Sequence, residues 1–336
     1  MTNRQVRLHR RPSGAPTPDD FSFTDSPVPH VEDGHVLRRT IYLSLDPYMR
    51  GRMSDARSYA KPVAVGDVMV GGTISQVVES RHPSFKAGDF VVGADGWQQY
   101  ASSAPTGLRT LDSSIAPIST ALGVLGMPGL TAYVGLLDVG QAKSGETVVV
   151  SAASGAVGSV VGQIARLKGC RAVGIAGSKD KCHYLTRELG FHAAVNHRDP
   201  DLPAALGAAC PDGIDVYFEN VGGVVLEAVL GLINRGARIP LCGLVSQYNM
   251  RPLPPGPNLI PLLTNRARIH GFLVLDHYDR FDAFVREVGS WVRSGELRYR
   301  EDIVDGIDAA PQALIGLLEG KNFGKLLVRV SPDPSR

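Results

Sequence analysis

The sequence of 336 residues predicts an α/β fold, in which a doubly wound parallel sheet is inserted in a β-rich domain. Short apolar runs separated by Gly, Pro and Asp occupy about the first 115 residues. From residue 119 to about residue 295, β-branched runs alternate with helical patterns, and a helix followed by a strand ends the chain. A chain of this length exceeds what one hydrophobic core usually supports, so two domains are expected.

The β-rich domain is expected at residues 1–118 and is completed by residues 309–336. Its strands are predicted at residues 36–45, 68–78 and 90–93, and the pairs Gly66-Asp67 and Gly88-Asp89 are typical of turns placed before strands. This pattern favours a small antiparallel barrel. The tail contributes a helix at 311–318 and a strand at 325–330, which we expect to rejoin the first domain.

The second domain is expected at residues 119–308. Its strands are nearly continuous apolar runs, which is typical of a parallel sheet covered by helices on both faces. Glycines at 169, 190 and 236 are predicted to end the helices. The expected strands are 148–150, 172–176, 214–218, 237–242 and 269–274, and the expected helices are 157–167, 179–189 and 224–233.

The composition excludes several classes of protein. The net charge of +2 and the lack of basic runs interleaved with aromatics argue against nucleic acid as a partner. No apolar run approaches the roughly 20 residues of a membrane span, and the polar first residues do not resemble a signal peptide. The four cysteines are too widely spaced for a zinc knuckle or a disulfide framework, so a reducing, cytoplasmic location is expected; they are Cys170, Cys182, Cys210 and Cys242.

A glycine-rich turn follows the first strand of the second domain. The pattern is Ala153-x-Gly155-x-x-Gly158, with Ala156 and Val157 between the two glycines. Gly155 allows the backbone to approach a pyrophosphate, Gly158 allows the helix to pack closely on the strand, and the helix N-terminus offers N–H groups to phosphates. Ala153 replaces the usual first glycine. The flanking strand and helix favour a Rossmann dinucleotide site over a purely structural turn.

The end of the next strand predicts which dinucleotide is bound. An Asp or Glu there, about 20 residues after the glycine turn, usually holds the ribose 2′-OH of NAD. Here Gly177 and Ser178 follow the strand, and Lys179, Asp180 and Lys181 begin the helix, where an acid suits the helix dipole. Small residues and a lysine suit a 2′-phosphate. The sequence therefore predicts NADPH.

These motifs occur with several further short segments in a fixed order along nearly the whole chain. They are Ser-Leu-Asp-Pro-Tyr-Met-Arg at 44–50, Leu-Gly-Met-Pro-Gly-Leu-Thr-Ala-Tyr at 125–133, Glu-Asn-Val-Gly-Gly at 219–223, Cys-Gly at 242–243, Ser-Gln-Tyr-Asn at 246–249 and Gly-Lys-Asn-Phe-Gly-Lys at 320–325. With them, the sequence resembles the medium-chain dehydrogenase/reductase superfamily. Within it, the chain is similar to the zinc-independent branch of prostaglandin/leukotriene reductases and plant alkenal double-bond reductases.

The resemblance implies a GroES-like catalytic domain, a Rossmann domain, a homodimer and a set of cofactor contacts. Ser178 and Lys181 would meet the 2′-phosphate. Relatives often have Asn-Tyr, with the Tyr against the adenosine phosphate, where this chain has Asn196-His197, so His197 either substitutes for that contact or loses it. The remaining implied contacts are Met127, Thr131, Phe272, Leu273 and Asn322 near the nicotinamide, and Asn220, Cys242, Gly243 and Tyr248 along the strand ends.

The resemblance also implies that no metal is bound. The zinc-dependent branch has a Cys ligand and a Gly-His-Glu segment in its catalytic domain, and this chain has Leu45-Asp46-Pro47 and Gly71-Gly72-Thr73 in the corresponding stretches. The cysteines of a structural zinc site are missing as well. Without a Lewis acid to stabilise an alkoxide, direct oxidation of a simple alcohol is disfavoured.

Three residues are candidates for the chemistry of an enone reductase. Hydride transfer to the β-carbon leaves negative charge on the carbonyl oxygen, so a hydrogen-bond donor aimed at that oxygen lowers the barrier. By resemblance, Tyr278 matches the catalytic tyrosine of the plant branch, and His277 stands where an animal branch has its tyrosine. Tyr48, within the 44–50 segment, is expected in the wall of the substrate pocket.

The function expected from the sequence is zinc-independent, NADPH-dependent reduction of the carbon–carbon double bond of α,β-unsaturated carbonyl compounds. Two alternatives stay open: a quinone oxidoreductase on the same fold, and a non-catalytic NADPH-binding protein. Hydrolase and nucleotide-triphosphatase chemistry is not indicated, because the sequence contains neither a Gly-x-Ser-x-Gly elbow nor a P-loop.

Overall fold

The computed structural model describes residues 2–114 and 116–335. They form two compact units. Unit 1 contains the chain up to Leu122, Glu301–Asn322 and the residues from Leu326 on, and unit 2 contains Gly123–Arg300 with Phe323–Lys325. The boundaries differ from the expected positions 118 and 308. The later boundary moves because strand β14 (Glu301–Asp305) is the neighbour of β15 (Lys325–Arg329) in the sheet of unit 1.

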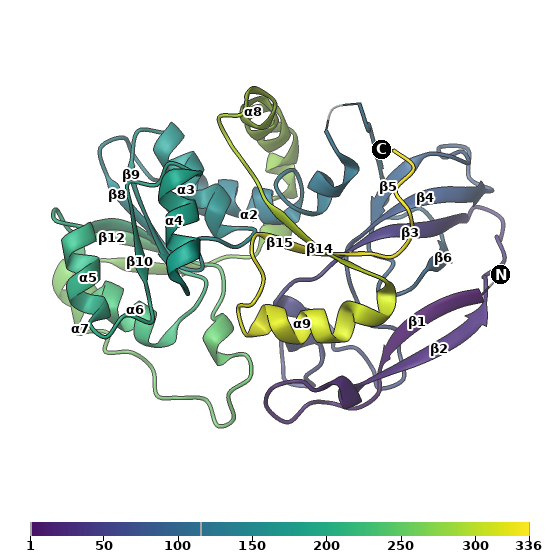
Figure 1. The fold of residues 1–336 in the computed structure, drawn as a ribbon, viewed down its shortest axis with the longest axis horizontal. Coiled ribbons are helices and arrows are strands. Elements are labelled where there is room, and N and C mark those ends of the chain that lie inside the picture. The colour runs from purple at the N-terminus through teal and green to yellow at the C-terminus, as the bar shows by residue number, and fades with distance from the viewer. Residues whose placement is uncertain (1, 115, 336) are drawn as a thin grey trace. The chain divides into compact units, whose positions relative to one another are not determined.

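Unit 1 is built from antiparallel strands in two sheets (Figure 1). The hairpin of β1 (Thr2–Leu8) and β2 (Phe21–Pro27) forms one sheet. The other has the order β14-β15-β3-β4-β5-β7, and β6 pairs with β3 outside this path. The remaining elements of unit 1 are β3 (Val36–Ser44), β4 (Thr73–Ser80), β5 (Phe90–Gly93), β6 (Tyr100–Ser103), β7 (Arg109–Leu111), α1 (Tyr48–Arg52), α9 (Ala310–Leu318), η1 (Pro18–Asp20), η2 (Ile118–Leu122) and η6 (Ile307–Ala309).

The strand predicted at 68–78 begins later than expected. Gly71 and Gly72 interrupt it, and Val68 makes only an isolated bridge to Arg7. Glycines carry no side chain to pack on a pleated sheet, so a Gly-Gly pair is a common place for a strand to start or stop. The strand predicted at 90–93 is confirmed as β5.

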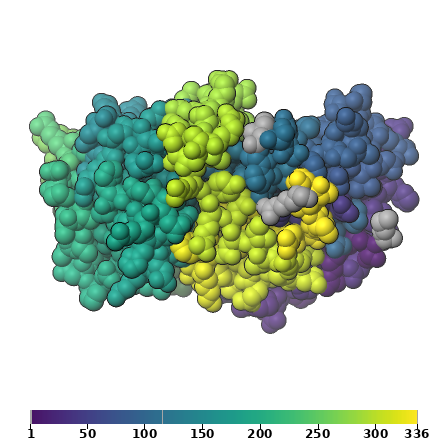
Figure 2. Space-filling view, turned by 45° about the horizontal axis from the view of Figure 1, so that its top comes forward, coloured from purple at the N-terminus to yellow at the C-terminus, as the bar shows by residue number. Residues whose placement is uncertain are grey.

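The C-terminal tail completes unit 1. Strand β15 pairs antiparallel with β3, and the N–H of Val330 donates to the carbonyl oxygen of Ile41 at 2.8 Å. Beyond the strand, the hydroxyl of Tyr42 donates to Oδ2 of Asp333 at 3.0 Å. In Figure 2 these last residues (yellow) lie against residues of the first strands of the same unit. Residues some 290 positions apart in sequence therefore share one sheet.

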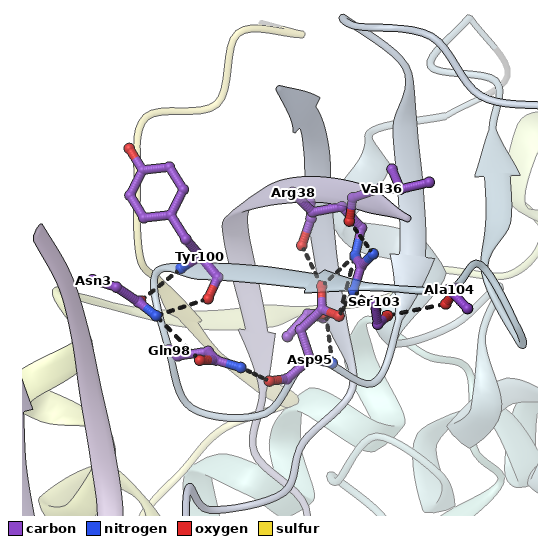
Figure 3. A network of polar contacts seen from close by, with 10 residues as sticks. Asn3, Val36, Arg38, Asp95, Gln98, Tyr100, Ser103 and Ala104 are labelled. Carbon is purple, nitrogen blue, oxygen red and sulfur yellow. Dashed lines mark hydrogen bonds and ion pairs between the residues drawn. The ribbon is translucent and has the colours of Figure 1, made fainter. Parts of the chain in front are cut away.

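A buried ion pair lies inside unit 1 (Figure 3). Arg38 is 1% exposed, and its Nη2 lies 2.6 Å from Oδ1 of Asp95. The same guanidinium donates to the carbonyl oxygen of Val36, and Ser75 and Ser103 complete the shell around the pair. Removing one partner of such a pair typically costs about 3–5 kcal/mol, because the other charge is left buried and uncompensated. The pair therefore holds β3, β4 and β6 in one arrangement.

A hollow of about 390 Å³ borders this network. Its polar walls are already bonded to one another. Asn3 donates to the carbonyl oxygen of Tyr100 at 3.0 Å, and Gln98 donates to that of Asp95 at 2.7 Å. The bond from Asn3 connects the β1–β2 hairpin to the rest of unit 1. None of the cofactor residues predicted from the sequence lines the hollow.

Unit 2 contains a six-stranded parallel sheet with the order β10-β9-β8-β11-β12-β13. This is the 3-2-1-4-5-6 order of a Rossmann domain, whose chain reverses direction across the sheet between β8 and β11. The predicted fold class is confirmed. The strands are β8 (Thr147–Val150), β9 (Arg171–Ala176), β10 (Ala193–Asn196), β11 (Ile214–Phe218), β12 (Ile233–Leu241) and β13 (Arg268–Gly271).

Helices cover both faces of this sheet (Figure 1). Successive side chains of a strand point to opposite faces. Val148 and Val150 accordingly pack into one core cluster and Val149 into the other. The first face is covered by α2 (Met127–Val134), α3 (Gly158–Leu167), α4 (Lys179–Arg187) and α8 (Phe281–Ser294), and the second by α5 (Leu202–Ala209), α6 (Gly223–Leu230) and α7 (Ile260–Asn265).

Three element predictions in unit 2 need correction. The helix predicted at 224–233 ends at Leu230, because residues from Ile233 on belong to β12. Gly236 is not a helix stop: it lies inside β12 with φ of 78°, where the register with β11 is irregular. The strand predicted at 269–274 ends at Gly271, and Val274 begins η5 (Val274–Arg280). Strand β10 was not predicted.

In the part of the chain that the structure describes, no helix has the length and apolar character that a bilayer crossing needs. The four cysteines are free thiols.

Candidate functional site

The glycine-rich turn joins β8 to α3 in unit 2. A Cβ added to Gly158 would lie 2.5 Å from the carbonyl oxygen of Ala152, a contact that real Cβ atoms do not make. Ala152 adopts φ of 49°, and its carbonyl oxygen also accepts from the N–H of Gly155 at 2.9 Å. A glycine is therefore required at position 158 for the start of α3 to pack against the backbone of the turn. Val157 provides no side-chain cap for α3. The N–H groups of Ser159 and Val160 already donate to the carbonyl oxygens of Gly155 and Val157, so an anion would meet the N–H groups that precede Ser159.

A segment from the end of the chain lies against this turn. The N–H of Gly324 donates to the carbonyl oxygen of Ser154 at 3.1 Å, and Gly324 forms a parallel bridge with Gly155. Phe323 packs edge-on against Tyr184 of α4, with ring centroids 4.8 Å apart. The guanidinium of Arg300 lies 4.1 Å from the centre of the Phe323 ring. Phe323–Lys325 thus braces the turn, which explains why residues near 320–325 accompany the glycine motif in the sequence.

Basic residues gather at the ends of β9 and β10. Ser178 caps α4, and its Oγ accepts from the N–H of Lys181 at 3.3 Å. A Cβ on Gly177 would lie 3.1 Å from Nε2 of His197 and 4.0 Å from Nη2 of Arg198, so both side chains lie over this glycine. Burial lowers the pKa of His197, and the neighbouring charges of Arg198 and Lys181 lower it further. The ends of these two strands therefore bring His197 and Arg198 over Gly177, close to the start of α4.

A buried carboxyl group organises the ends of β8 and β11. Oε1 of Glu219 accepts from Oγ of Ser151 at 2.9 Å, from the hydroxyl of Tyr217 at 2.9 Å and from the N–H of Val221 at 2.6 Å. Ser151 in turn accepts from the N–H of Asn220 at 2.9 Å, and Nδ2 of Asn220 donates to the carbonyl oxygen of Ser151 at 2.8 Å. Burial raises the pKa of Glu219, although these hydrogen bonds partly oppose the shift. Asn220 is held rigidly at the switch point of the sheet.

The end of β12 lies beside Asn220. The N–H groups of Cys242 and Gly243 both donate to the carbonyl oxygen of Glu219, at 2.9 and 3.2 Å. The hydroxyl of Tyr248 would lie 3.1 Å from a Cβ on Gly243, which shows how close it comes to that backbone. Burial raises the pKa of Cys242 to about 12, so its thiol is protonated and weakly reactive.

Two predicted residues lie on α2, one turn apart. Met127 begins the helix and is half-buried, and Thr131 is buried one turn later. Oγ1 of Thr131 donates to the carbonyl oxygen of Met127 at 2.8 Å, which fixes its rotamer.

The predicted donors lie in η5, after the end of β13. Phe272 is half-buried and packs edge-on against Phe218 of β11, with centroids 6.1 Å apart, whereas Leu273 is exposed. The His277 ring lies 6.3 Å from that of Phe272, and Tyr278 stacks on Phe281 at 6.1 Å. Tyr278 is 48% exposed, so this face of unit 2 presents its phenol to the outside.

Because the sheet is parallel, the carboxyl ends of all its strands lie at one edge. That edge brings together predicted residues from segments spread over 120 positions, from Ala153 to Leu273. They are Ala153, Gly155, Ala156, Val157 and Gly158 after β8, Gly177, Ser178 and Lys181 after β9, His197 after β10, Asn220 after β11, Cys242, Gly243 and Tyr248 after β12, and Phe272 and Leu273 after β13.

Tyr48 and Asn322 belong to unit 1. Tyr48 begins α1 and is half-buried against the apolar cluster that contains Met49 and Trp97. Asn322 is half-buried and follows α9.

The stretch that corresponds to a zinc ligand in the zinc-dependent branch has an apolar environment here. A Cβ on Gly71 would lie 2.7 Å from Cδ1 of Leu43 and 3.2 Å from both Cε of Met49 and Cδ1 of Trp97. Within residues 2–114 and 116–335, no group of three His, Cys, Asp or Glu side chains is arranged to hold a metal ion. Thioether and indole groups in this setting do not offer the nitrogen, thiolate and carboxylate ligands that zinc prefers.

Sequence reasoning missed Arg198, Glu219 and Ser151 as contributors to this edge. The position of Arg198 directly after a strand would have indicated its role, but strand β10 was not predicted. Glu219 was noticed only as part of a family segment, and its role becomes visible only when β8 and β11 are seen as neighbours.

Comparisons with known proteins show the family and the fold of the chain. Residues 4–111 match the model of an N-terminal domain of oxidoreductase, and residues 156–290 match that of a zinc-binding dehydrogenase. The NADPH-dependent curcumin reductase of Escherichia coli is 54% identical over 98% of each chain, and the 2-alkenal reductase (NADP(+)-dependent) of Nicotiana tabacum is 43% identical over 99% of each. The crystal structure of CurA from Vibrio vulnificus in complex with NADPH is 51% identical, with a TM-score of 0.94, over 98% of this chain and 100% of that one.

The two units and the glycine turn define the class of protein: an oxidoreductase with a Rossmann domain and a separate β-rich domain. The chain belongs to the medium-chain dehydrogenase/reductase superfamily, in the zinc-independent branch that contains the alkenal and prostaglandin reductases.

Proposed function

We propose that this protein reduces the carbon–carbon double bond of α,β-unsaturated carbonyl compounds with NADPH as the hydride donor. The observation that carries the proposal is the cationic, acid-free end of β9 beside a glycine turn that leaves N–H donors for a pyrophosphate. Relatives named as reductases of curcumin, of 2-alkenals and of (+)-pulegone support the substrate class.

The residues present fit NADPH. We assign the pyrophosphate to the turn of Gly155–Gly158 with the N–H groups that precede Ser159, and the 2′-phosphate to Ser178, Lys181 and His197, joined by Arg198. When bound, NADPH supplies the hydride. The other proposed cofactor contacts are Asn220, Cys242, Gly243 and Tyr248 along the strand ends, and Met127, Thr131, Phe272, Leu273 and Asn322 near the nicotinamide.

Protein side chains stabilise the charge that develops on the substrate. As the β-carbon accepts hydride, negative charge collects on the carbonyl oxygen, and a positioned O–H or N–H donor stabilises it. We assign this role to Tyr278, whose phenol is exposed at the sheet edge, with His277 as the neighbouring alternative. Tyr48 is assigned to the wall of the substrate pocket. The proton then required at the α-carbon comes from the donor or from water.

The function is tested by following NADPH oxidation with 2-alkenals, enones, 15-keto-prostanoid-like enones and quinones. We expect turnover of the alkenals and enones, with saturated carbonyl products. Turnover of quinones alone would instead indicate a quinone oxidoreductase. NADPH binding without turnover of any acceptor would indicate a non-catalytic protein.

Metal chelation is expected to leave activity unchanged. The Gly71 region is filled by Leu43, Met49 and Trp97 rather than by ligands, and the proposed reaction uses no Lewis acid. The measurement is enone turnover after prolonged dialysis against a chelator, with elemental analysis of the same sample. Activity lost on dialysis and restored by zinc would show that a metal is required.

We also propose that the protein is a cytoplasmic homodimer that associates through the edge of the unit 2 sheet. All four residues of β13 are exposed, and its outer side has no neighbouring strand in the described sheet. Exposed large apolar side chains lie on β13 and on the segment that precedes it. They include Ile269 on β13, Ile260 and Leu263 on α7, and Leu253 and Leu259 before α7. An open edge with an exposed apolar surface favours pairing with a second copy. The four free cysteines support a reducing compartment.

Leu263→Glu is expected to shift the protein from dimer to monomer, because Leu263 is 79% exposed on α7. Light scattering during size-exclusion chromatography measures the mass. Val224→Glu is the matched control, since Val224 is 67% exposed but lies on α6. A wild-type monomer, or a Leu263→Glu variant that stays dimeric, would contradict this interface.

A further inference from the structure

The segment that carries His277 and Tyr278 is not a regular helix. Within η5, His277 has φ of −126° and ψ of 21°, which interrupts the helical conformation. At its two ends, the N–H of Asp276 donates to the carbonyl oxygen of Leu273, and the N–H of Phe281 donates to that of Tyr278. Short 3₁₀ turns have poor hydrogen-bond geometry. The position of these two side chains therefore depends on what anchors the segment at each end.

The first anchor is Phe272. Its ring packs against Phe218 of β11. A Cβ on Gly135 would lie 2.5 Å from Cζ of Phe272 and 2.6 Å from Cε2 of Phe218. The two rings thus occupy the space that any side chain at position 135 would need.

The second anchor is Arg280, two residues after Tyr278. Its Nε lies 2.9 Å from Oδ2 of Asp138, and its Nη2 lies 3.2 Å from Oδ1. The guanidinium also lies 5.8 Å from the centre of the Tyr133 ring, whose hydroxyl donates to Oε2 of Glu287 at 2.7 Å. Exposed ion pairs usually contribute little to stability. A pair with two hydrogen bonds in which the guanidinium also lies over an aromatic ring nevertheless fixes the orientation of the arginine side chain.

Both anchors meet the same turn of the chain. Gly135 and Asp138 belong to η3 (Gly135–Val139), a π-helical turn in which the N–H of Gly140 donates to the carbonyl oxygen of Gly135 at 2.9 Å. Such turns are rare and occur often at functional sites. Gly135 of this turn leaves space for the Phe272 ring, and Asp138 supplies the carboxylate that binds Arg280. Phe272 and Arg280 lie at the two ends of one segment.

We propose that the π turn η3 is a positioning element for the donor segment, with Asp138 and Gly135 as its positioning residues. The proposal rests on the proposed reductase function, in which Tyr278 or His277 donates to the substrate oxygen. Loss of the Asp138–Arg280 pair frees the end of η5 next to Tyr278, and a displacement of about 1 Å in a reacting group can cost about a hundredfold in rate. The Asp138–Arg280 pair includes no residue assigned to the cofactor, so its loss is expected to leave the Kd of NADPH nearly unchanged.

The central variant is Asp138→Asn, which keeps the shape of the side chain and removes its charge. We expect kcat for an enone to fall about tenfold, the factor that corresponds to one charged hydrogen bond, while the Kd of NADPH stays within about twofold. Hydrogen–deuterium exchange in residues 272–280 should become faster, with the sheet strands unaffected. Asp138→Glu should recover part of the loss.

A double-mutant cycle tests whether the two residues act as one unit. The kcat of Arg280→Gln, and that of the double variant with Asp138→Asn, should both equal the kcat of Asp138→Asn. Either single change already breaks the ion pair, so the second change removes no further interaction. Asp305→Asn is the matched control. It breaks an ion pair with Arg329 in unit 1, at 2.6 Å, and should change neither kcat nor exchange in η5.

Each outcome decides the proposal. Unchanged kcat in folded Asp138→Asn overturns it, whether or not exchange in η5 rises. A loss of kcat accompanied by an equal loss of NADPH affinity and of thermal stability shows a general structural role and also overturns it. If the wild-type protein turns over no enone, the proposed function fails. In that case, faster exchange in η5 still shows that the π turn holds the segment, and unchanged exchange overturns the positioning role independently.

Discussion

Tyr278→Phe is expected to lower kcat for an enone by about 10²–10³-fold while NADPH binds with nearly unchanged affinity. The substitution keeps the ring, so the stacking on Phe281 at 6.1 Å and the path of η5 are preserved. Only the hydroxyl that would donate to the developing enolate oxygen is removed. Stopped-flow or steady-state kinetics on one enone, with NADPH titrated by fluorescence, separates the two effects. The loss will be smaller if the ribose 2′-OH of the cofactor also donates to that oxygen.

His277→Ala is the paired variant, because the two candidates are adjacent and relatives differ by one position. With Tyr278 as the donor, His277→Ala should have the smaller effect on kcat. The opposite result, with normal turnover in Tyr278→Phe and a severe loss in His277→Ala, moves the role to His277. Normal turnover in both variants would leave cofactor and solvent as the proton source and would refute the assignment of a donor in η5.

The second large effect is expected from Lys181→Ala, which should weaken NADPH about tenfold or more and NADH hardly at all. Lys181 lies at the end of β9, where its charge and that of Arg198 both lower the pKa of His197. The 2′-phosphate of NADPH would gain a charge-assisted hydrogen bond from Lys181. NADH has no such group, so it gains nothing from the lysine.

Cofactor affinities of wild type and variant, measured by titration calorimetry for both dinucleotides, give the ratio directly. Arg187→Ala is a suitable control, since Arg187 is an exposed cation at the other end of the same helix. Arg198→Ala should act in the same direction as Lys181→Ala. Equal weakening of NADPH and NADH by Lys181→Ala would show that the 2′-phosphate lies elsewhere.

Local patterns predicted the elements whose signal is confined to their own residues. The strands at 90–93 and 214–218 are found with those bounds, because continuous β-branched or apolar runs between turn residues leave few alternatives. The helix predicted at 157–167 is found at Gly158–Leu167, one residue shorter at its start.

The predictions that were wrong depend on tertiary pairing. Leu232 and Ile233 continue the apolar pattern of the preceding helix. However, Ile233 pairs with Ile214 across the sheet, and the positive φ of Gly236 allows the bulge that extends β12 backwards. Strand β10 is short and partly polar, and it exists because Val195 pairs beside Ile175 of β9. With β10 unseen, Arg198 could not be placed beside Lys181.

The sequence by itself determined the class of fold, the position of the phosphate-binding turn and the absence of an acid at the end of β9. These features depend on contiguous residues, because the structural effect of a glycine, a lysine or a missing carboxylate is confined to a few neighbouring positions. Only the tertiary structure decided which strand ends meet, and so which residues share a site. The bonds from Glu219 to Ser151, from Gly324 to Ser154 and from Arg280 to Asp138 join residues 68 to 170 positions apart, and no periodicity encodes such pairs. They form because parallel pairing of β8 with β11, and packing of the chain end and of η5 on unit 2, bring these groups within hydrogen-bond distance.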